Sequence, residues 1–213
     1  MFASLSNELP ALVAVHGYWI VALLVGLESA GVPLPGEAAL VAASIYAGST
    51  GNLAVGGVIA AAAMGAVAGD NLGYTLGRTL GLPLLLRHGQ RLGLTEPKVK
   101  LGRYLFNRYG SMLVFFGRFV ALLRVLTAFL AGVNHMAWPR FFLFNLLGGV
   151  AWSGTFGLGG YVLGGQIHRL TGPIAVFGIA LAVLVIAIAR VMLHRQQVRL
   201  IAEAERAYPG PLT

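Results

Sequence analysis

The sequence predicts an all-α integral membrane protein, a bundle of helices that cross the lipid bilayer. Hydrophobic residues make up 57% of the 213 residues and charged residues only 10%, whereas a soluble domain carries roughly 25% charged residues. A soluble fold cannot bury so much apolar surface. Apolar runs of about 20 residues, the length of a membrane-crossing helix, recur along most of the chain. We therefore expect one polytopic membrane domain over residues 1–213.

Four apolar runs are long enough to form transmembrane helices. They lie at about 11–27, 53–75, 141–165 and 173–193. The residues before the first run lack the basic region of a secretory signal, so we expect the first helix to stay in the protein. We expect the residues after the fourth run, 194–213, to form a cytoplasmic tail.

Two further apolar segments, at about 28–50 and 111–133, contain residues that interrupt a simple helix. Non-helical backbone at membrane depth must be satisfied by protein or trapped water. We therefore interpret both segments as re-entrant hairpins inside the bundle, with tilted and kinked full spans as the alternative. The interruptions are Pro33, Pro35 and Gly36 in the first segment, and Gly117 and Gly132 beside two arginines in the second.

Basic residues predict the orientation of the bundle, because cytoplasmic loops carry an excess of Lys and Arg. Such residues gather between Arg78 and Arg108 and again after Arg190. Both regions are cytoplasmic if the second interrupted segment is re-entrant, which also places the N-terminus in the cytoplasm. The two hairpins then enter from opposite sides, as in the inverted repeats of many secondary transporters. A second segment that fully spanned would put the two basic regions on opposite sides.

Two smaller patterns also indicate a membrane bundle. Residues 95–109 mix apolar and basic side chains after a helix-start signal, which predicts an amphipathic helix on the cytoplasmic face. A stripe of small residues at every fourth position predicts close packing of one membrane helix against a neighbour. This stripe consists of Gly65, Gly69, Gly73, Gly77 and Gly81.

Composition excludes several kinds of chemistry. The chain has no cysteine, so it forms no disulfide and no thiolate metal site, and its five histidines lack metal-ligand spacing. We find no phosphate-cradling loop, so no cofactor and no metal are implied. The net charge of +8 comes from separate basic regions, which indicates membrane topology and no nucleic-acid partner.

Three of the seven acidic residues, Glu28, Glu37 and Asp70, fall inside apolar stretches or at their ends. A charge deep in a bilayer costs from about 2.5 to more than 10 kcal/mol, so such residues face a cavity, pair with another charge or bind a proton. The alternative is that Glu37 caps a helix and Glu28 lies among the headgroups.

Two arginines, Arg118 and Arg124, lie six residues apart in an apolar context. Because arginine stays charged, each needs an anion. The candidates are Glu28 and Glu37, or the phosphate of a ligand, which arginine grips bidentately. One arginine alone can reach the membrane surface. Six residues of helix span about 9 Å, however, so the two cannot easily reach the same surface.

Further polar residues lie near these charges in the sequence. Asp70, Tyr74 and Arg78 share one helix face, and the alternative is a polar stripe beside the cytoplasmic headgroups. We interpret Asn145 and Trp152, in the third apolar run, as supporting residues, with simple packing as the alternative.

These motifs resemble the DedA family of bacterial membrane proteins, which is related to the eukaryotic VTT-domain lipid scramblases. The similarity covers about residues 20–165. It is carried by the Glu28–Glu37 segment, the Gly-Asp-Asn-Leu-Gly-Tyr-Thr-Leu-Gly-Arg motif that ends at Arg78, Gly117-Arg118-Phe119 with Arg124, Gly132, Phe141, Asn145, Trp152, and Gly160-Tyr161.

The resemblance implies two facing re-entrant hairpins and lipid transport in a bacterial cytoplasmic membrane. Undecaprenyl phosphate is a leading substrate of the family, and proton coupling is suggested for some members. By motif position, the functional acids fall on Glu28 and Glu37, and the functional arginines on Arg118 and Arg124. Many members have proline where this chain has Ala121 and Ala128, so a break in the second segment would form here without proline.

Our hypothesis is a non-enzymatic translocase for an anionic lipid phosphate. Arg118 and Arg124 would hold the phosphate, and Glu28 and Glu37 would pair with them in the empty state and exchange protons. The expected partners are membrane lipids, a polyprenyl phosphate and protons, and the oligomeric state is open, a homo-oligomer included.

The alternatives are a proton-coupled transporter of small ions or solutes, and a phospholipid scramblase. A membrane lipid phosphatase is disfavoured, because the histidine nearest in sequence to the arginines is His135, which we expect in a loop. A purely structural scaffold would leave the buried charges unexplained.

Overall fold

The computed structural model describes residues 2–88, 96–166, 200–204 and 206–210, and every regular element in this part of the chain is helical. This confirms the predicted all-α fold. The labelled elements are α1 (Phe2–Ser29), α2 (Gly36–Thr50), α3 (Val55–His88), α4 (Glu96–Tyr109), α5 (Ser111–Phe116), the 3-10 turn η2 (Gly117–Phe119), α6 (Ala121–Val133) and α7 (Trp138–Gln166).

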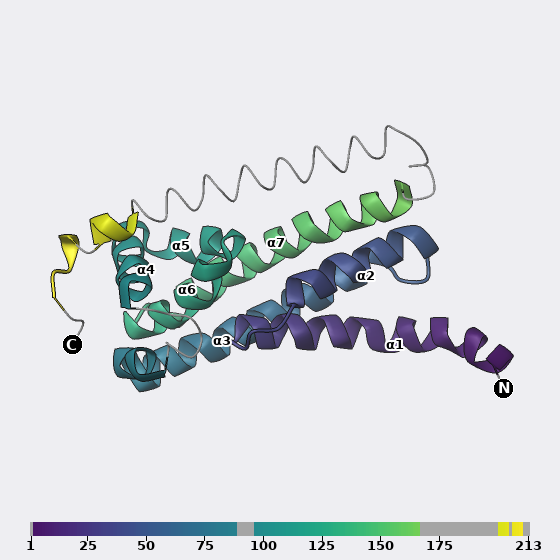
Figure 1. Ribbon diagram of the computed structural model, residues 1–213, viewed down its shortest axis with the longest axis horizontal. Coiled ribbons are helices and arrows are strands. Elements are labelled where there is room, and N and C mark those ends of the chain that lie inside the picture. The colour runs from purple at the N-terminus through teal and green to yellow at the C-terminus, as the bar shows by residue number, and fades with distance from the viewer. Residues whose placement is uncertain (1, 89–95, 167–199, 205, 211–213) are drawn as a thin grey trace.

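Helices α1, α2, α3 and α7 lie along the longest axis of the molecule, while α4, α5 and α6 gather toward one end (Figure 1). Helix α1 packs on α3, and α2 packs on α7. Helix α3 also packs on α6 and α7, so it contacts helices from both interrupted segments and lies at the centre of the arrangement. The interrupted segments therefore come together against the same two long helices.

Two helices in the described part are long and apolar enough to cross a membrane, Val55–Gly81 and Trp138–Gln166. These helices correspond to the predicted runs at 53–75 and 141–165, and their crossing of a membrane stays a prediction. The predicted span at 11–27 lies within α1, and the one at 173–193 lies outside the described residues. The amphipathic segment at 95–109 forms α4, whose place at a membrane surface stays a prediction.

The first interrupted segment breaks where its prolines predict. Helix α1 ends at Ser29, residues 32–35 are not helical, and α2 begins at Gly36. Helices α1 and α2 contact each other and form a helical hairpin around this break. The start of α1 and the end of α2 lie toward the same end of the molecule (Figure 1).

The second interrupted segment also breaks, although it has no proline at Ala121 or Ala128. Val120 is extended, with φ −119° and ψ 113°, and it separates η2 from α6. The start of α1 and the helical turn at 200–204 lie at opposite ends of the molecule (Figure 1), whereas the sequence predicted both termini on one side. The sides of the membrane on which they lie, and the entry of the hairpins into it, stay predictions.

The first half of the glycine stripe brings α3 into backbone contact with α1. A Cβ added at Gly65 would collide with the carbonyl of Ala22, and one added at Gly69 with the carbonyl of Gly26. Any larger side chain would therefore push α1 and α3 apart. This confirms close packing for this part of the stripe.

The second half of the stripe contacts a different helix. A Cβ at Gly77 would collide with the carbonyl of Phe129 in α6, and one at Gly132 of α6 would lie 2.7 Å from the backbone nitrogen of Arg78. The stripe ends at Gly81, where φ is 66° and ψ is −170°, so the helix is kinked there. The sequence pattern missed this kink because Gly81 continues the spacing.

Candidate functional site

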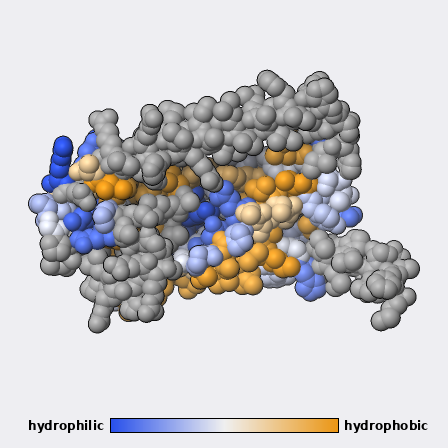
Figure 2. All heavy atoms as spheres, in the orientation of Figure 1, coloured by the Kyte–Doolittle hydropathy of each residue, from blue (hydrophilic) through white to orange (hydrophobic). Residues whose placement is uncertain are grey.

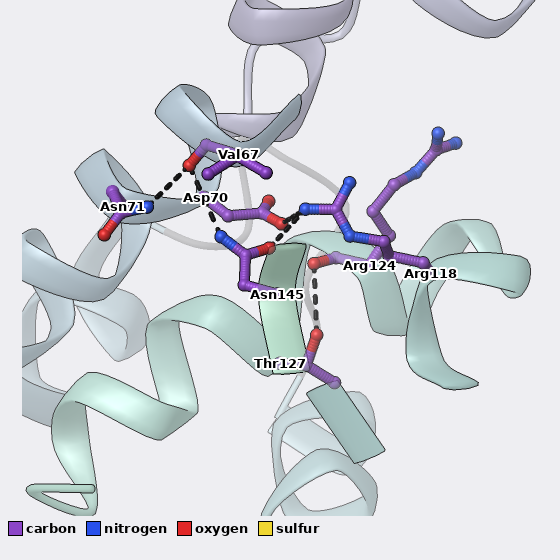
Figure 3. Close-up of polar contacts among 7 residues, drawn as sticks. All are labelled: Val67, Asp70, Asn71, Arg118, Arg124, Thr127 and Asn145. Atoms are coloured by element: carbon purple, nitrogen blue, oxygen red, sulfur yellow. Dashed lines mark hydrogen bonds and ion pairs between the residues drawn. The ribbon is translucent and has the colours of Figure 1, made fainter. Parts of the chain in front are cut away.

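Charged side chains of the two interrupted segments and of α3 form two groups, one around Arg118 and one around Arg124. The two arginines lie on either side of the break at Val120, and their guanidinium groups point in different directions (Figure 3). Figure 2 shows hydrophilic residues gathered near the middle of the visible face, between regions of hydrophobic residues. We name the groups the Arg118 group and the Arg124 group and define their members below.

The Arg118 group consists of Arg118, Asp70 and Asn145, from η2, α3 and α7. Nη2 of Arg118 donates to Oδ2 of Asp70 and to Oδ1 of Asn145 (Figure 3). The side chains of Arg118 and Asp70 are only 1% and 4% exposed. Nδ2 of Asn145 donates to the Val67 carbonyl oxygen at 3.3 Å, so the amide orients the arginine and ties α7 to α3. This group is closed and joins three elements.

Small residues on α7 make room for the Arg118 side chain. A Cβ at Gly148 would lie 3.3 Å from Cδ of Arg118, and one at Gly149 would lie 3.5 Å from Nη1. Within the described residues, Nε and Nη1 of Arg118 and Oδ1 of Asp70 have no hydrogen-bond partner. The ion pair is therefore tightly enclosed but not fully satisfied.

The Arg124 group consists of Arg124, Glu28, Glu37 and Trp152, from α6, α1, α2 and α7. Nη2 of Arg124 donates to Oε1 of Glu28 at 3.2 Å and to Oε2 of Glu37 at 3.3 Å. The guanidinium carbon lies 5.0 Å from the Trp152 ring centroid, within cation–π range. Arg124 is 4% exposed, whereas Glu28 is 18% and Glu37 is 44% exposed. This group is therefore open on its acidic side.

The structure changes how the sequence predictions assign partners. Arg124 contacts both Glu28 and Glu37, as predicted, but Arg118 contacts Asp70 instead. The physical reason is the break at Val120, which separates the arginines so that they do not follow one continuous helix. The sequence analysis also missed the contact between Arg118 and Asn145. Asn145 is an amide within an apolar run, and this was the sequence feature that could have indicated a polar partner.

Tyr74 and Arg78 belong to neither group. Nη1 of Arg78 donates to the Tyr74 hydroxyl at 2.7 Å, and this hydroxyl donates to the Met136 carbonyl oxygen. The Tyr74 ring stacks on Phe141 with centroids 4.5 Å apart. These contacts connect α3 to α7 and to the turn before it. His135 lies in that turn with φ 51°, which confirms its predicted place in a loop.

The Arg124 group has the charges that anion binding requires. Its arginine is buried and faces two carboxylates on other helices, so an incoming anion would replace an existing partner rather than fill an apolar space. In the part of the chain that the structure describes, no three or more His, Cys, Asp or Glu residues are placed to hold a metal ion.

The family of the chain follows from comparison with known proteins. Residues 34–162 match the VTT domain. The chain belongs to the VTT-domain family. The VTT domain is the domain of the DedA family, so the resemblance inferred from the motifs is confirmed at this level. The matched residues include the second interrupted segment, the first from residue 34 on, and the arginines of both groups, whereas Glu28 and Pro33 lie just before the match.

Relatives of this VTT-domain protein are named as uncharacterized membrane proteins. One from Mycobacterium tuberculosis is 40% identical over 196 residues, 88% of each chain. One from Mycobacterium leprae is 39% identical over 199 residues, 90% of this chain and 91% of the relative. One from Synechocystis is 41% identical over 147 residues, 69% of this chain and 67% of the relative. No solved structure gives a significant match. The protein is a VTT-domain membrane protein.

Proposed function

We propose that this VTT-domain protein transports an anionic lipid phosphate, undecaprenyl phosphate, across the bacterial cytoplasmic membrane. The observation that carries the proposal is the Arg124 group, in which a buried guanidinium contacts carboxylates from both arms of the first hairpin. A guanidinium binds phosphate as it binds carboxylate, through charge-assisted hydrogen bonds. The phosphate would enter the group while the polyprenyl tail stays in the lipid.

The two arginines have different parts in this proposal. The sequence analysis assigned the phosphate to both, but Arg118 already has Asp70 and Asn145 as partners. The proposal therefore gives the phosphate contact to Arg124. Arg118 would hold η2 against α3 and α7, which keeps the start of α6 and its arginine in position.

Proton coupling is the second part of the proposal. When phosphate takes the place of a carboxylate beside Arg124, an uncompensated negative charge would remain in a low-dielectric site. Protonation of that carboxylate removes the charge. Transport would then depend on the pH difference across the membrane, and an exchange rate that does not change with pH would overturn this part.

The experiment is leaflet exchange of undecaprenyl phosphate in liposomes that contain the purified protein. The wild type should exchange the lipid, and Arg124→Ala and Glu28→Gln should reduce exchange toward the level of empty liposomes. Arg108→Ala is the matched control, because it removes an arginine of α4 that contacts Tyr104 at the surface. This variant should exchange the lipid at the wild-type rate.

The same liposomes distinguish the alternatives. Exchange of phosphatidylcholine at the same rate would replace the proposal with a phospholipid scramblase. Ion flux without lipid exchange would replace it with a small-ion transporter. The substrate assignment would be overturned if the wild-type protein exchanged undecaprenyl phosphate no faster than empty liposomes do, with or without a pH gradient.

A further inference from the structure

The carboxylate of Glu28 occupies the N-terminus of α2. Oε2 of Glu28 accepts a hydrogen bond from the backbone N–H of Glu37 at 3.0 Å, and Oε1 accepts one from Nη2 of Arg124 at 3.2 Å. Proline at position 35 is the N-cap residue of α2 and supplies no side-chain cap. A helix N-terminus carries free N–H groups and a partial positive charge. Glu28, which lies nine residues before Glu37 in the chain, therefore serves as the anion at this helix end.

Gly36 makes this contact sterically feasible. A Cβ at Gly36 would collide with the Glu28 carboxylate and would lie 2.8 Å from Cα of Val25 and 2.9 Å from the Leu24 carbonyl oxygen. The end of α1 thus approaches the start of α2 only because position 36 has no side chain. The carboxylate lies against backbone, as anions do at the glycine-containing helix starts that bind phosphate.

A second observation is an unpaired donor on the guanidinium that contacts Glu28. Nη1 of Arg124 is buried and has no hydrogen-bond partner among the described residues, while Nη2 of the same guanidinium contacts both carboxylates. The two oxygens of Glu28 are already engaged, one by the helix start and one by Nη2. A phosphate monoester has a third terminal oxygen, to which Nη1, unpaired within the described part of the chain, would donate.

We propose that Glu28 is an internal occupant of the phosphate site, and that the lipid phosphate binds by displacing it from the N-terminus of α2 and from Arg124. Glu28 takes up one proton as it leaves and becomes a neutral acid, so the charge that enters with the phosphate is partly balanced. This inference rests on the proposed function, and it adds the site's backbone donors and the identity of the group that is protonated.

The charged groups that face Glu28 support an exchange at this position. Among the described elements packed on α1, α6 supplies Arg124, whose guanidinium contacts the Glu28 carboxylate. Helix α2 supplies Glu37, whose backbone N–H donates to that carboxylate. Helix α3 brings Asp70, which is held by Arg118. The sequence of α7 has one charged residue, Arg140, in its first turn. Arg124 is thus the cation whose partner must change when Glu28 leaves.

Glu37 provides a matched control. Its carboxylate contacts the same nitrogen of Arg124 at 3.3 Å but is 44% exposed, and its contribution to the helix end is its backbone N–H. Glu37→Gln removes one negative charge beside Arg124 and keeps that N–H. Glu28→Gln removes one negative charge from the helix end itself.

The test is binding of farnesyl phosphate, a short polyprenyl phosphate, to the full chain in lipid nanodiscs by titration calorimetry, with farnesol as the probe without phosphate. At pH 8, Glu28→Gln should bind farnesyl phosphate about tenfold more tightly than the wild type, because a neutral amide competes less for the site. The difference should shrink as the pH is lowered, because protonation of Glu28 in the wild type removes the charge that competes with the phosphate. Glu37→Gln should tighten the binding of farnesyl phosphate less than Glu28→Gln does.

A second measurement uses only the wild-type protein, so it does not depend on whether a variant folds. Infrared difference spectra of the wild type should gain a protonated-carboxyl band when farnesyl phosphate is added and not when farnesol is added. Binding by Glu28→Gln equal to or weaker than the wild type at pH 8, or no carboxyl band on binding, would overturn the inference. Equal tightening in Glu28→Gln and Glu37→Gln would also overturn it, since the helix end would then play no part.

The readout separates this inference from the proposed function. If Glu28→Gln tightens binding as expected but the wild type exchanges no lipid between leaflets, the anion site stands and the transport assignment fails. If lipid is exchanged but Glu28→Gln does not tighten binding, transport stands and the displacement of Glu28 fails.

Discussion

Arg118 and Arg124 come from the same apolar stretch, six residues apart, but their surroundings differ. Arg118 lies in a closed group with Asp70 and Asn145, where both charges are nearly inaccessible. Arg124 is as deeply buried, but its partners Glu28 and Glu37 are partly exposed and come from both arms of a hairpin. A closed ion pair maintains an arrangement of helices, whereas an open one can exchange partners. Burial of an arginine therefore does not by itself identify a binding site.

The largest expected effect is the loss of stability in Asp70→Leu. This variant leaves Arg118 charged and unpaired inside the protein, and loss of one partner of a buried pair costs about 3–5 kcal/mol. The free energy of unfolding in mixed detergent micelles with increasing dodecyl sulfate measures the effect. Glu37→Leu is the control, because it removes a half-exposed partner and leaves Arg124 paired with Glu28. Equal destabilisation by both variants would show that the two groups do not differ.

The second prediction replaces the whole closed ion pair. Arg118→Met combined with Asp70→Leu removes both charges together, and buried pairs replaced by apolar residues often leave stability unchanged or raise it by about 1–4 kcal/mol. The double variant should therefore unfold at a higher concentration of dodecyl sulfate than Asp70→Leu alone. A double variant no more stable than the single one would mean that the pair is not the source of the effect.

The third prediction concerns the contact between α3 and α6 that holds both groups together. Gly77→Ala puts a methyl group into the Phe129 carbonyl, and overpacking of this kind costs about 1–3 kcal/mol. Gly73→Ala is the matched control on the same stripe, because its Cβ would lie 3.5 Å from Cβ of Ala128, an ordinary contact. Thermal unfolding in detergent compares the two. Equal melting temperatures for both variants would argue against backbone contact at Gly77.

The smallest expected effect is the coupling between Arg124 and Trp152. A double-mutant cycle with Arg124→Met, Trp152→Leu and the combined variant isolates the interaction of the guanidinium with the ring. We expect a coupling free energy of about 0.5–2 kcal/mol, the range for cation–π contacts. Additive losses in the combined variant would remove Trp152 from the Arg124 group.

The sequence predicted the helical interruptions better than the partners. Pro33 and Pro35 interrupt α1 and α2 because each restricts the backbone and lacks an N–H. The interruptions of the second segment were expected at Gly117 and Gly132, and the structure has its extended residue at Val120, between them. The pairing of Arg124 with Glu28 joins residues 96 apart in sequence. It was expected because each charge needs a partner in an apolar environment.

The pairing of Arg118 could not be read from the sequence, because the direction of each side chain depends on the backbone around the break. Asp70 follows the spacing of Tyr74 and Arg78 along α3, and this helical period suggested a common stripe. In the folded chain, Tyr74 and Arg78 contact the turn at Met136, whereas Asp70 contacts Arg118. Residues on the same face of one helix can therefore contact different neighbours.

The sequence by itself determined the helical fold, the apolar runs long enough to cross a membrane, the two interruptions and the set of charged residues within the apolar stretches. These follow from local chemistry, namely hydropathy, helix periodicity and the backbone restrictions of proline and glycine. Only the tertiary structure decided that α1 is an arm of the first hairpin, and that Glu28 lies at the N-terminus of α2. The physical reason is that the direction of the chain after each break, and so the partner of each charge, depends on how whole helices pack.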